Sequence, residues 1–224
     1  MINNFLLRIL SSLIIAPLCF YIVYKGSFFF ISFLLICLIF IITESKNLIT
    51  QKKHFVLFIV FIFFSLFCAY KIRNFYIDNE TKNIIIFFGV LLISISTDIG
   101  GYVFGKIIKG PKLTNISPNK TYSGSIGGIF LTLLILILYS NIFSKELNFF
   151  YKLYLNNFIF FLFIIISASL ISQIGDLVIS FLKRKAKIKN TGKIIPGHGG
   201  ILDRIDGMIF TFPFMYIWII ILEI

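Results

Sequence analysis

Seven segments of the 224-residue chain are almost purely apolar and nearly long enough to cross a lipid bilayer as helices. A helix needs about 20 apolar residues to span the hydrocarbon, where every backbone polar group must be satisfied within the segment. We therefore predict an all-α, polytopic membrane protein with about seven transmembrane helices, and an eighth helix in the loops stays open. The predicted spans cover residues 8–24, 27–43, 54–70, 84–103, 126–143, 158–179 and 207–222.

The composition agrees with a membrane protein and excludes two other classes. Hydrophobic residues make up 58% of the chain and charged residues 13%. A soluble domain is about half apolar and a quarter charged, and a disordered chain needs low hydrophobicity. The apolar run after Arg8 lacks a small-residue cleavage site and is predicted to be an uncleaved first span. With no repeat or linker, residues 1–224 are expected to form a single membrane domain.

The formal net charge of +12 has several possible origins. Nucleic acid, an anionic membrane face, a phosphorylated substrate and the codon bias of an AT-rich genome are four alternatives. If the seven spans cross the membrane in turn, successive connections lie on opposite sides. This assignment places 15 basic residues on one side and six on the other, and the uneven distribution tests the four alternatives. The richer side carries Arg8, Lys46, Lys52, Lys53, Lys106, Lys109, Lys112, Lys120, Lys183, Arg184, Lys185, Lys187, Lys189, Lys193 and Arg204.

Basic loops are retained in the cytosol, so this asymmetry predicts a cytoplasmic N-terminus and a C-terminus outside. Seven of the 15 basic residues fall within residues 180–206. Codon bias does not explain such clustering. We interpret the charge as membrane topology combined with phosphate binding, and we expect no nucleic-acid partner.

The three cysteines do not indicate a disulfide or a zinc site. Cys19, Cys37 and Cys68 lie singly in apolar runs, without a C-x-x-C motif or a nearby histidine. They are expected to behave as small buried apolar residues.

Four aspartates are predicted to lie at the cytoplasmic face. Asp98 and Asp176 occur near the cytoplasmic ends of long apolar segments. A carboxylate costs about 2.5–3.5 kcal/mol at a helix centre and less near the interface. Asp203 and Asp206 are three residues apart and open the last span. A single one could be an ordinary interfacial aspartate, but four would repel one another unless cations lay between them, which favours Mg²⁺ with phosphate and water. The other acids are interpreted as solvated charges: Glu44, Asp78, Glu80, Glu146 and Glu223.

Two glycine-rich stretches accompany these acids. Gly101 and Gly105 form a G-x-x-x-G spacing, for which helix packing is the favoured role and close approach to a ligand the alternative. The P-G-H-G-G run at 196–200 cannot be regular helix, and either it is a simple turn or its N–H groups bind phosphate. His198 is interpreted as either a solvent-facing loop residue or a catalytic one, and His54 is assigned no role.

The C-terminal block resembles the signature of the phosphatidate cytidylyltransferase (CDP-diacylglycerol synthase) family. The motif reads S-x-hydrophobic-K-R-x₄-K-D-x-G-x₂-hydrophobic-P-x-H-G-G-hydrophobic-x-D-R-hydrophobic-D, with the spacing intact. Its matching residues are Ser180, Lys183, Arg184, Lys189, Gly192, Pro196, His198, Gly199, Gly200, Asp203, Arg204, Ile205 and Asp206. Upstream, Gly175-Asp176-Leu177, the segment 117–124 and Asp98 with Tyr102 are similar to further family motifs. The resemblance covers residues 94–210.

Three positions depart from the family pattern. Asn190 stands where the family usually has Asp, Ser123 where it has Glu, and Tyr122 where it has Trp. The aromatic side chain is kept, but two acids are lost together with their hydrogen bonds or outer-shell metal contacts. The N-terminal half is also short for the family.

The resemblance implies a nucleotidyltransferase that converts CTP and phosphatidic acid to CDP-diacylglycerol and diphosphate with Mg²⁺, and a second cation is left open. It implies a multi-pass protein of a bacterial inner membrane, active at the cytoplasmic side, and a homodimer is left open. The implied catalytic residues are Asp176, Asp206, Lys183, Arg184, His198 and Arg204. The implied substrate-binding residues are Ser117, Lys120, Thr121, Ser180, Lys189, Gly199 and Gly200. The implied metal ligands are Asp176, Asp206, Asp203 and Asp98.

Three alternatives stay open from the residues. A CTP-dependent lipid kinase, or a cytidylyltransferase for another lipid phosphate, would use similar metals and basic loops. A transporter or channel would use intramembrane acids for ions, and predicts acids in mid-span rather than at one interface. A structural membrane protein would leave the motif without a function.

Overall fold

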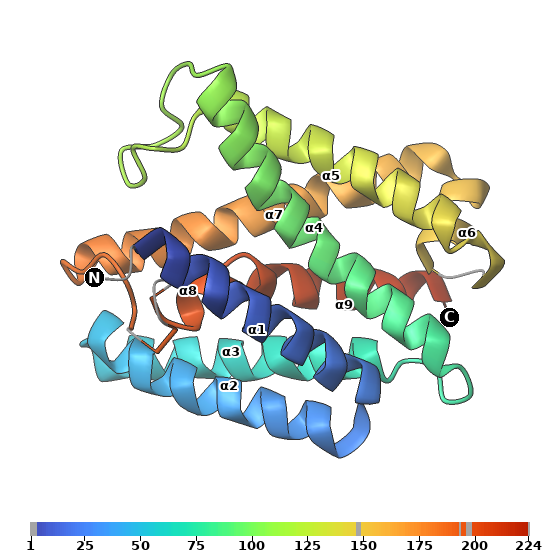
Figure 1. Ribbon diagram of the computed structural model, residues 1–224, viewed down its shortest axis with the longest axis horizontal. Helices are drawn as coiled ribbons and strands as arrows, with labels where there is room; N and C mark the ends of the chain where they lie inside the picture. Colours follow the sequence, from blue (N-terminus) through green and yellow to red (C-terminus); the bar gives the residue numbers. More distant parts are fainter. Residues whose placement is uncertain (1–3, 147–148, 193, 196–198, 224) are drawn as a thin grey trace.

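The computed structural model describes residues 4–146, 149–192, 194–195 and 199–223, and it is built from helices (Figure 1). Each of the seven predicted apolar segments corresponds to a helix of the described residues, with only residues 143 and 207 outside the helix bounds, so the all-α prediction is confirmed. The long helices are α1 (Asn4–Lys25), α2 (Ser27–Leu48), α3 (Lys52–Arg73), α4 (Glu80–Ile107), α5 (Tyr122–Ile142), α7 (Phe158–Lys185) and α9 (Met208–Glu223). Short ones are α6 (Phe149–Asn156), α8 (Leu202–Ile205) and a 3₁₀ turn at Ser144–Glu146.

Five of these helices are long and apolar enough to cross a membrane: α2, α3, α4, α5 and α7. The apolar stretches Leu13–Lys25 of α1 and Met208–Leu222 of α9 are shorter. A multi-pass membrane protein is therefore supported, with five spans meeting the length criterion rather than seven. The helices that lie in the predicted loops, α6 and α8, are eight and four residues long, too short to span.

Local sequence explains where the helices begin. Asn79 and Asn157 accept hydrogen bonds from the third residue of α4 and α7, at 2.9 and 3.0 Å. Thr121 accepts one from Gly124 N at the start of α5, at 3.1 Å. These are ordinary N-caps, which satisfy a backbone N–H that would otherwise lack a partner. Gly26, with φ +60°, makes the tight turn between α1 and α2.

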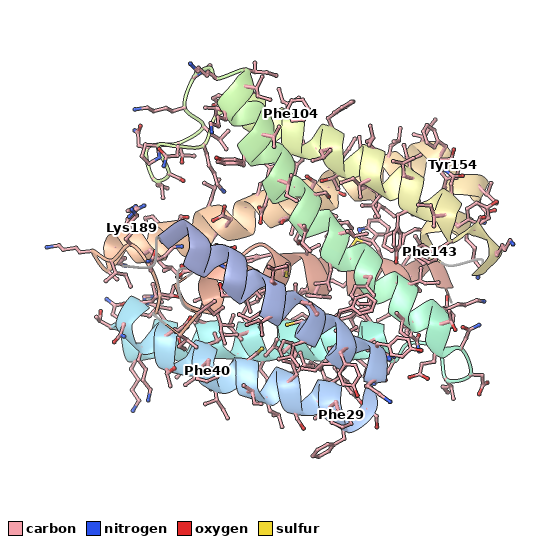
Figure 2. The ribbon with its side chains drawn as sticks, in the orientation of Figure 1. Phe29, Phe40, Phe104, Phe143, Tyr154 and Lys189 are labelled. Atoms are coloured by element: carbon pink, nitrogen blue, oxygen red, sulfur yellow. The ribbon has the colours of Figure 1, made fainter. Side chains whose placement is uncertain are left out.

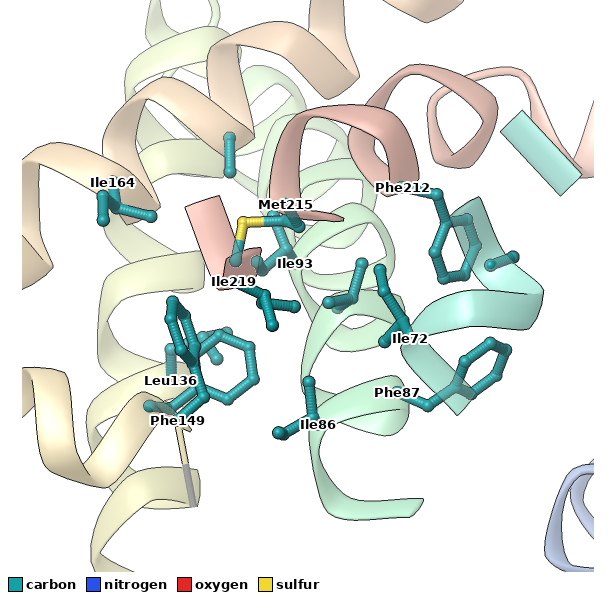
Figure 3. Close-up of a cluster of buried hydrophobic side chains, with 14 of the residues drawn as sticks. Ile72, Ile86, Phe87, Ile93, Leu136, Phe149, Ile164, Phe212, Met215 and Ile219 are labelled. Atoms are coloured by element: carbon teal, nitrogen blue, oxygen red, sulfur yellow. The ribbon is translucent and has the colours of Figure 1, made fainter. Parts of the chain in front are cut away.

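The interior is an apolar cluster to which most of the long helices contribute. Phe87 and Ile93 of α4, Phe212 and Met215 of α9 and Leu136 of α5 are among its buried side chains (Figure 3). The outward faces are also apolar, as at Phe29, which is 56% exposed (Figure 2). Apolar residues on both faces are typical of helices surrounded by lipid.

The three glycines of α4 near Asp98 pack against α5. A Cβ on Gly100 would lie 2.7 Å from the carbonyl oxygen of Gly127, and one on Gly124 would lie 2.6 Å from that of Gly101. Gly105 also faces Gly124. The helix-packing prediction for the G-x-x-x-G spacing is therefore confirmed, and Gly101 also borders a cavity between α4, α5 and α7.

The chain alternates so that three connections lie at one end of the molecule. The links between α2 and α3, between α4 and α5, and between α7 and α8 all lie at the end where α1 begins (Figure 1). Lys189 lies at this end as well (Figure 2). The opposite end holds Arg73, which is 1% exposed and donates to Val23 O at 2.7 Å and Glu80 Oε1 at 3.3 Å. Arg73 is thus a buried structural cation rather than a loop charge.

Candidate active site

Three carboxylates converge near the basic end from separate parts of the chain. Asp98 is on α4, Asp176 on α7, and Asp206 in the turn before α9. Asp206 is 9% exposed, its Oδ1 accepts from Gly207 N at 3.0 Å, and its carboxyl group is close enough to Asp176 to hydrogen-bond. Burial, reinforced by the charges of Asp176 and Asp98, raises the pKa of Asp206 to about 8. We call these three residues the open acidic cluster.

Buried hydroxyl groups form hydrogen bonds between the helices that carry this cluster. Thr97, next to Asp98, contacts Ser169 of α7 at 2.8 Å and Thr132 of α5 at 2.9 Å. Ser94 donates to Thr211 of α9 at 3.0 Å. Hydrogen bonds between helices satisfy polar side chains inside an apolar bundle and set the helices in register. These hydrogen bonds therefore hold α4, α7 and α9 in register, and the three carboxylates lie on or next to these helices.

Two residues of the open acidic cluster, Asp98 and Asp176, line a polar cavity of about 320 Å³ between α4, α5 and α7, and Asp206 lies buried behind Asp176. Its lining includes Asp98, Asp176, Ser117, Lys120, Thr121 and Gln173. Lys120 forms an ion pair with Asp176 Oδ2 across it. The predicted binding residues of the 117–124 motif thus meet two of the predicted acids.

The connection between α4 and α5 folds back on itself to bring Lys120 there. Leu113 N donates to Lys120 O at 2.8 Å, and Tyr122 N donates to Pro111 O at 3.2 Å. The departure at Ser123 is accommodated locally, because its hydroxyl donates to Lys109 O and lies 3.0 Å from Thr121 Oγ1. Lys120 is thereby held over the acids by backbone hydrogen bonds.

Among the lining residues that the sequence did not indicate is Gln173, which forms hydrogen bonds across the cavity wall. Gln173, three residues before Asp176 on α7, accepts from Ser125 Oγ at 2.5 Å and donates to Ser125 O at 3.2 Å. It therefore joins α7 to α5 on the wall of the cavity. An amide inside an otherwise apolar run was the available signal.

Asp203 lies apart from the other three acids. Its Oδ1 accepts from Lys183 Nζ at 2.8 Å, and its Oδ2 accepts from Thr191 N at 2.8 Å and Gly200 N at 3.0 Å. Although burial opposes it, these hydrogen bonds and the Lys183 charge lower the pKa of Asp203. The four predicted metal ligands are thus divided into three that converge and one that is enclosed by protein donors.

Glu44 contradicts the sequence prediction of a solvated charge. It lies in the last turns of α2, is 3% exposed, and accepts from Ile201 N, Leu202 N and Thr191 Oγ1, each at 2.9 Å. The prediction was wrong because the connection between α7 and α8, which we call the signature loop, brings Thr191, Ile201 and Leu202 to the end of α2. We call Glu44 and Asp203 the closed acidic pair, since both carboxylates are filled by protein donors.

The remaining predicted residues have varied surroundings. Ser180 Oγ donates to Asp176 Oδ1 at 3.3 Å, and Arg184 Nε is 3.5 Å from Ile116 O, while Lys189 is exposed. Gly199 N donates to Ile195 O at 3.1 Å and Gly200 N to Asp203, so both N–H groups are used within the loop. His198 lies outside the described residues.

A second cavity, about 390 Å³ and mostly apolar, lies on the other side of α4. Phe20 of α1, Leu91 of α4 and Met208 of α9 are among its lining residues, together with Arg204. The guanidinium of Arg204 is close enough to Asp98 for their charges to interact. A basic group therefore connects an apolar cavity to the open acidic cluster.

The donor chemistry of the open acidic cluster suits a hard cation that shares its coordination with a ligand. Within the described residues, no group of three or more His, Cys, Asp or Glu side chains is gathered tightly enough to hold a metal alone. Mg²⁺ usually takes one or two carboxylates and completes its shell with water and phosphate oxygens. Asp176 and Asp206, whose carboxyl groups are near enough to interact electrostatically, fit that arrangement.

Comparison with known proteins gives a consistent result. The model of the cytidylyltransferase family matches residues 51–222. A phosphatidate cytidylyltransferase of Bacillus subtilis is 41% identical over 122 residues, 54% of this chain and 42% of that protein. One of Rickettsia bellii is 43% identical over 122 residues, 54% and 52% of the two chains. One of Staphylococcus aureus is 37% identical over 147 residues, 65% and 53%. The chain thus matches about half the length of these curated relatives.

Proposed function

The chain belongs to the cytidylyltransferase family, and we propose that it transfers the cytidylyl group of CTP to phosphatidate, giving CDP-diacylglycerol and diphosphate. The observation that carries the proposal is that a polar and an apolar cavity both border α4 and are linked by charged side chains. Asp98 and Lys120 line the polar cavity, and Arg204, whose charge interacts with Asp98, lines the apolar one. A reaction between a water-soluble nucleotide and a lipid needs two such neighbouring sites. The names of the matched relatives support the same reaction.

The polar cavity is proposed to bind CTP. Lys120 has its ammonium group beside Asp176, where it can pair with triphosphate oxygens once the nucleotide enters. Ser117 and Thr121 line the same wall and offer hydroxyl groups. The ion pair with Asp176 places Lys120 between its carboxylate partner and an incoming phosphate, so its charge is available to both.

The apolar cavity is proposed to bind an acyl chain of phosphatidate. Its walls are aromatic and aliphatic side chains of α1, α4 and α9, which bury hydrocarbon favourably. Arg204 then receives the phosphate, since a guanidinium can form two parallel hydrogen bonds to phosphate oxygens. This places the lipid phosphate against Asp98, Asp176 and Asp206.

Mg²⁺ is proposed to be held by Asp176 and Asp206, and Asp98 contributes through water. Bound there, it would neutralise phosphate charge and fix the geometry for in-line displacement. A phosphate oxygen of phosphatidate attacks the α-phosphorus of CTP, and the bond to the diphosphate breaks. The attacking oxygen is already ionised, so the protein needs no general base. Lys120 and Arg204 hold the two anions together, which lowers the entropic cost of their meeting.

We also propose the finer topology. The two shorter apolar helices, α1 and α9, complete seven spans, with the N-terminus and the active site in the cytoplasm and the protein in a bacterial inner membrane. The placement of the basic connections at one end of the bundle supports this orientation. A homodimeric assembly stays a prediction.

The experiment that tests the function uses CTP labelled at either the α- or the γ-phosphorus. Purified protein with phosphatidate and Mg²⁺ is expected to move the α-label into lipid and to leave the γ-label in diphosphate. Transfer of the γ-label to a polyprenol or other lipid alcohol would establish a CTP-dependent kinase instead. Transfer of the α-label only to a different lipid phosphate would identify a related cytidylyltransferase.

A matched variant makes a negative result informative. Asp206→Asn keeps the size and shape of the side chain and is expected to abolish α-label transfer. If wild type and Asp206→Asn both give no product, the enzyme proposal fails and a transporter becomes the better explanation.

A further inference from the structure

Glu44 is a buried carboxylate that lies outside the region matched by the family model, which begins at residue 51. It lies in the last turns of α2 and is 3% exposed. Among the described residues, no lysine or arginine forms an ion pair with Glu44. Its oxygens are instead filled by three neutral donors of the signature loop, each at 2.9 Å. A buried carboxylate is stable only with such donors, so the contact between α2 and this loop is specific.

Two glycines of the family signature make room for this carboxylate. A Cβ on Gly192 would lie 2.8 Å from Glu44 Oε1, and a Cβ on Gly200 would lie 2.5 Å from Glu44 Oε2. Carbon and oxygen atoms cannot approach that closely without displacement. The loop therefore needs glycine at both positions to close over Glu44.

The contact extends from Glu44 to charged groups of the signature. The Thr191 hydroxyl lies 2.9 Å from Glu44 Oε2 and 3.0 Å from Asp203 Oδ2, and Asp203 in turn pairs with Lys183 at 2.8 Å. A hydroxyl has a single proton, so Thr191 is shared between two acceptors and holds both in place. A continuous chain of polar contacts thus joins α2 to α7.

Glu44 also fixes where α8 begins. The first residue of α8 is Leu202, and the N–H groups of Ile201 and Leu202 both donate to Glu44. Arg204 follows Leu202 by two residues and Asp206 by four. A displacement of the Leu202 backbone would therefore also displace Arg204 and Asp206, the two residues that the proposed reaction uses.

We propose that Glu44 is a positioning residue: it anchors Thr191, Ile201 and Leu202 to α2 and so sets Arg204 near Asp98 and Asp206 against Asp176. This inference rests on the proposed function. Lys120, Asp98 and Gln173 of the polar cavity lie on other segments and have no contact with Glu44 among the described hydrogen bonds. Loss of Glu44 is thus expected to impair turnover more than CTP binding.

The test compares Glu44→Gln with wild type in the CTP and phosphatidate assay. Glutamine has the same length, but its amide nitrogen would face the N–H of Leu202, which also lacks an acceptor in this variant. We expect kcat per folded molecule to fall at least tenfold, with KM for CTP changed less than threefold. Thr191→Val is expected to give a smaller loss of kcat. Thr191→Ser is expected to retain the wild-type kcat because serine keeps the hydroxyl group.

Amide hydrogen exchange separates positioning from general stability. In Glu44→Gln, exchange is expected to quicken within residues 191–202 and to stay unchanged in α3 and α5. Asp78→Asn, which removes one exposed carboxylate at the other end of the molecule, is the control and is expected to behave as wild type. Because this measurement needs no turnover, it can be made even on a poorly active variant.

The possible outcomes differ for the two proposals. An inactive wild type contradicts the proposed function. An active wild type with a folded, equally active Glu44→Gln contradicts the positioning role. Quickened exchange in all helices, with normal kcat in the folded fraction, would also overturn it, because Glu44 would then serve stability alone.

Discussion

The open acidic cluster and the closed acidic pair contain the same chemical group at the same end of the bundle, yet their surroundings are opposite. Glu44 and Asp203 accept hydrogen bonds from backbone N–H groups, a hydroxyl and an ammonium group. Asp98 and Asp176 line a cavity, with Lys120 as the cation paired to Asp176. A carboxylate whose acceptors are filled by protein stabilises the fold, whereas one whose acceptors face a cavity can bind a ligand.

Substitution of the open acidic cluster is expected to have the largest effect, and on activity rather than stability. Asp176→Asn or Asp206→Asn should lower kcat at least about 100-fold, since loss of one preorganised charged group costs about 10²–10³ in rate. The melting temperature of Asp206→Asn should stay level or rise, because asparagine replaces a carboxyl group whose ionised form is disfavoured by burial and by the charges of Asp176 and Asp98. CDP-lipid formation and thermal unfolding in detergent measure the two effects. A large drop in melting temperature would contradict this prediction, because it would show that these carboxylates stabilise the fold as those of the closed acidic pair do.

Substitution of Asp203 in the closed acidic pair is expected to have its main effect on stability. Asp203→Asn leaves the Lys183 ammonium buried without its carboxylate, and the free energy of unfolding should fall by about 3 kcal/mol. Denaturant unfolding measures this change, with Asp78→Asn as the exposed control. Unaltered stability would mean that the Asp203 contacts contribute no net energy, and the distinction between the two groups would lose its basis.

The cation of the open acidic cluster provides a finer test. Lys120→Gln should raise KM for CTP about 30-fold, which corresponds to about 2 kcal/mol for a charge-assisted hydrogen bond. Lys106→Gln removes an exposed lysine near the end of α4 and should leave KM unchanged. Steady-state kinetics at saturating phosphatidate distinguish the two variants. Equal effects from both would indicate a general surface potential rather than a specific contact.

Metal binding is expected to produce the smallest change. At a Mg²⁺ concentration about fivefold above Kd, a single site adds about 1 kcal/mol of stability, because binding to the folded state alone shifts the unfolding equilibrium. The melting temperature of wild type and Asp203→Asn should rise with Mg²⁺ and fall again with a chelator. Asp206→Asn should show no rise, and an equal rise in that variant would place the metal elsewhere.

Much of the fold could be predicted from sequence because lipid imposes a strong local rule. Each apolar segment had to be a helix, and all seven predicted segments are helical. The G-x-x-x-G spacing likewise indicated close helix packing, which Gly101 and Gly105 confirm against Gly124. α4 and α7 extend beyond the predicted spans to Ile107 and Lys185, because a helix can continue through the lysines and arginine that ended the apolar segments in the sequence.

The site was predicted in part. The motif residues Lys120 and Asp176 were expected to share a site, and they form an ion pair. Gln173 was missed, because one amide in an apolar run gives no partner. Glu44 was misassigned, because its position at the end of a span is equally typical of a solvated charge, and its donors lie about 150 residues away in the chain.

The sequence by itself determined that this chain is a bundle of apolar helices with a basic end and the motifs of a cytidylyltransferase. These properties depend on the number, type and order of residues along the chain. Only the tertiary structure decided which acids are closed and which are open. Ionised carboxylates are alike in their intrinsic chemistry, so their roles depend on the donors around them, and those donors come from distant helices and loops.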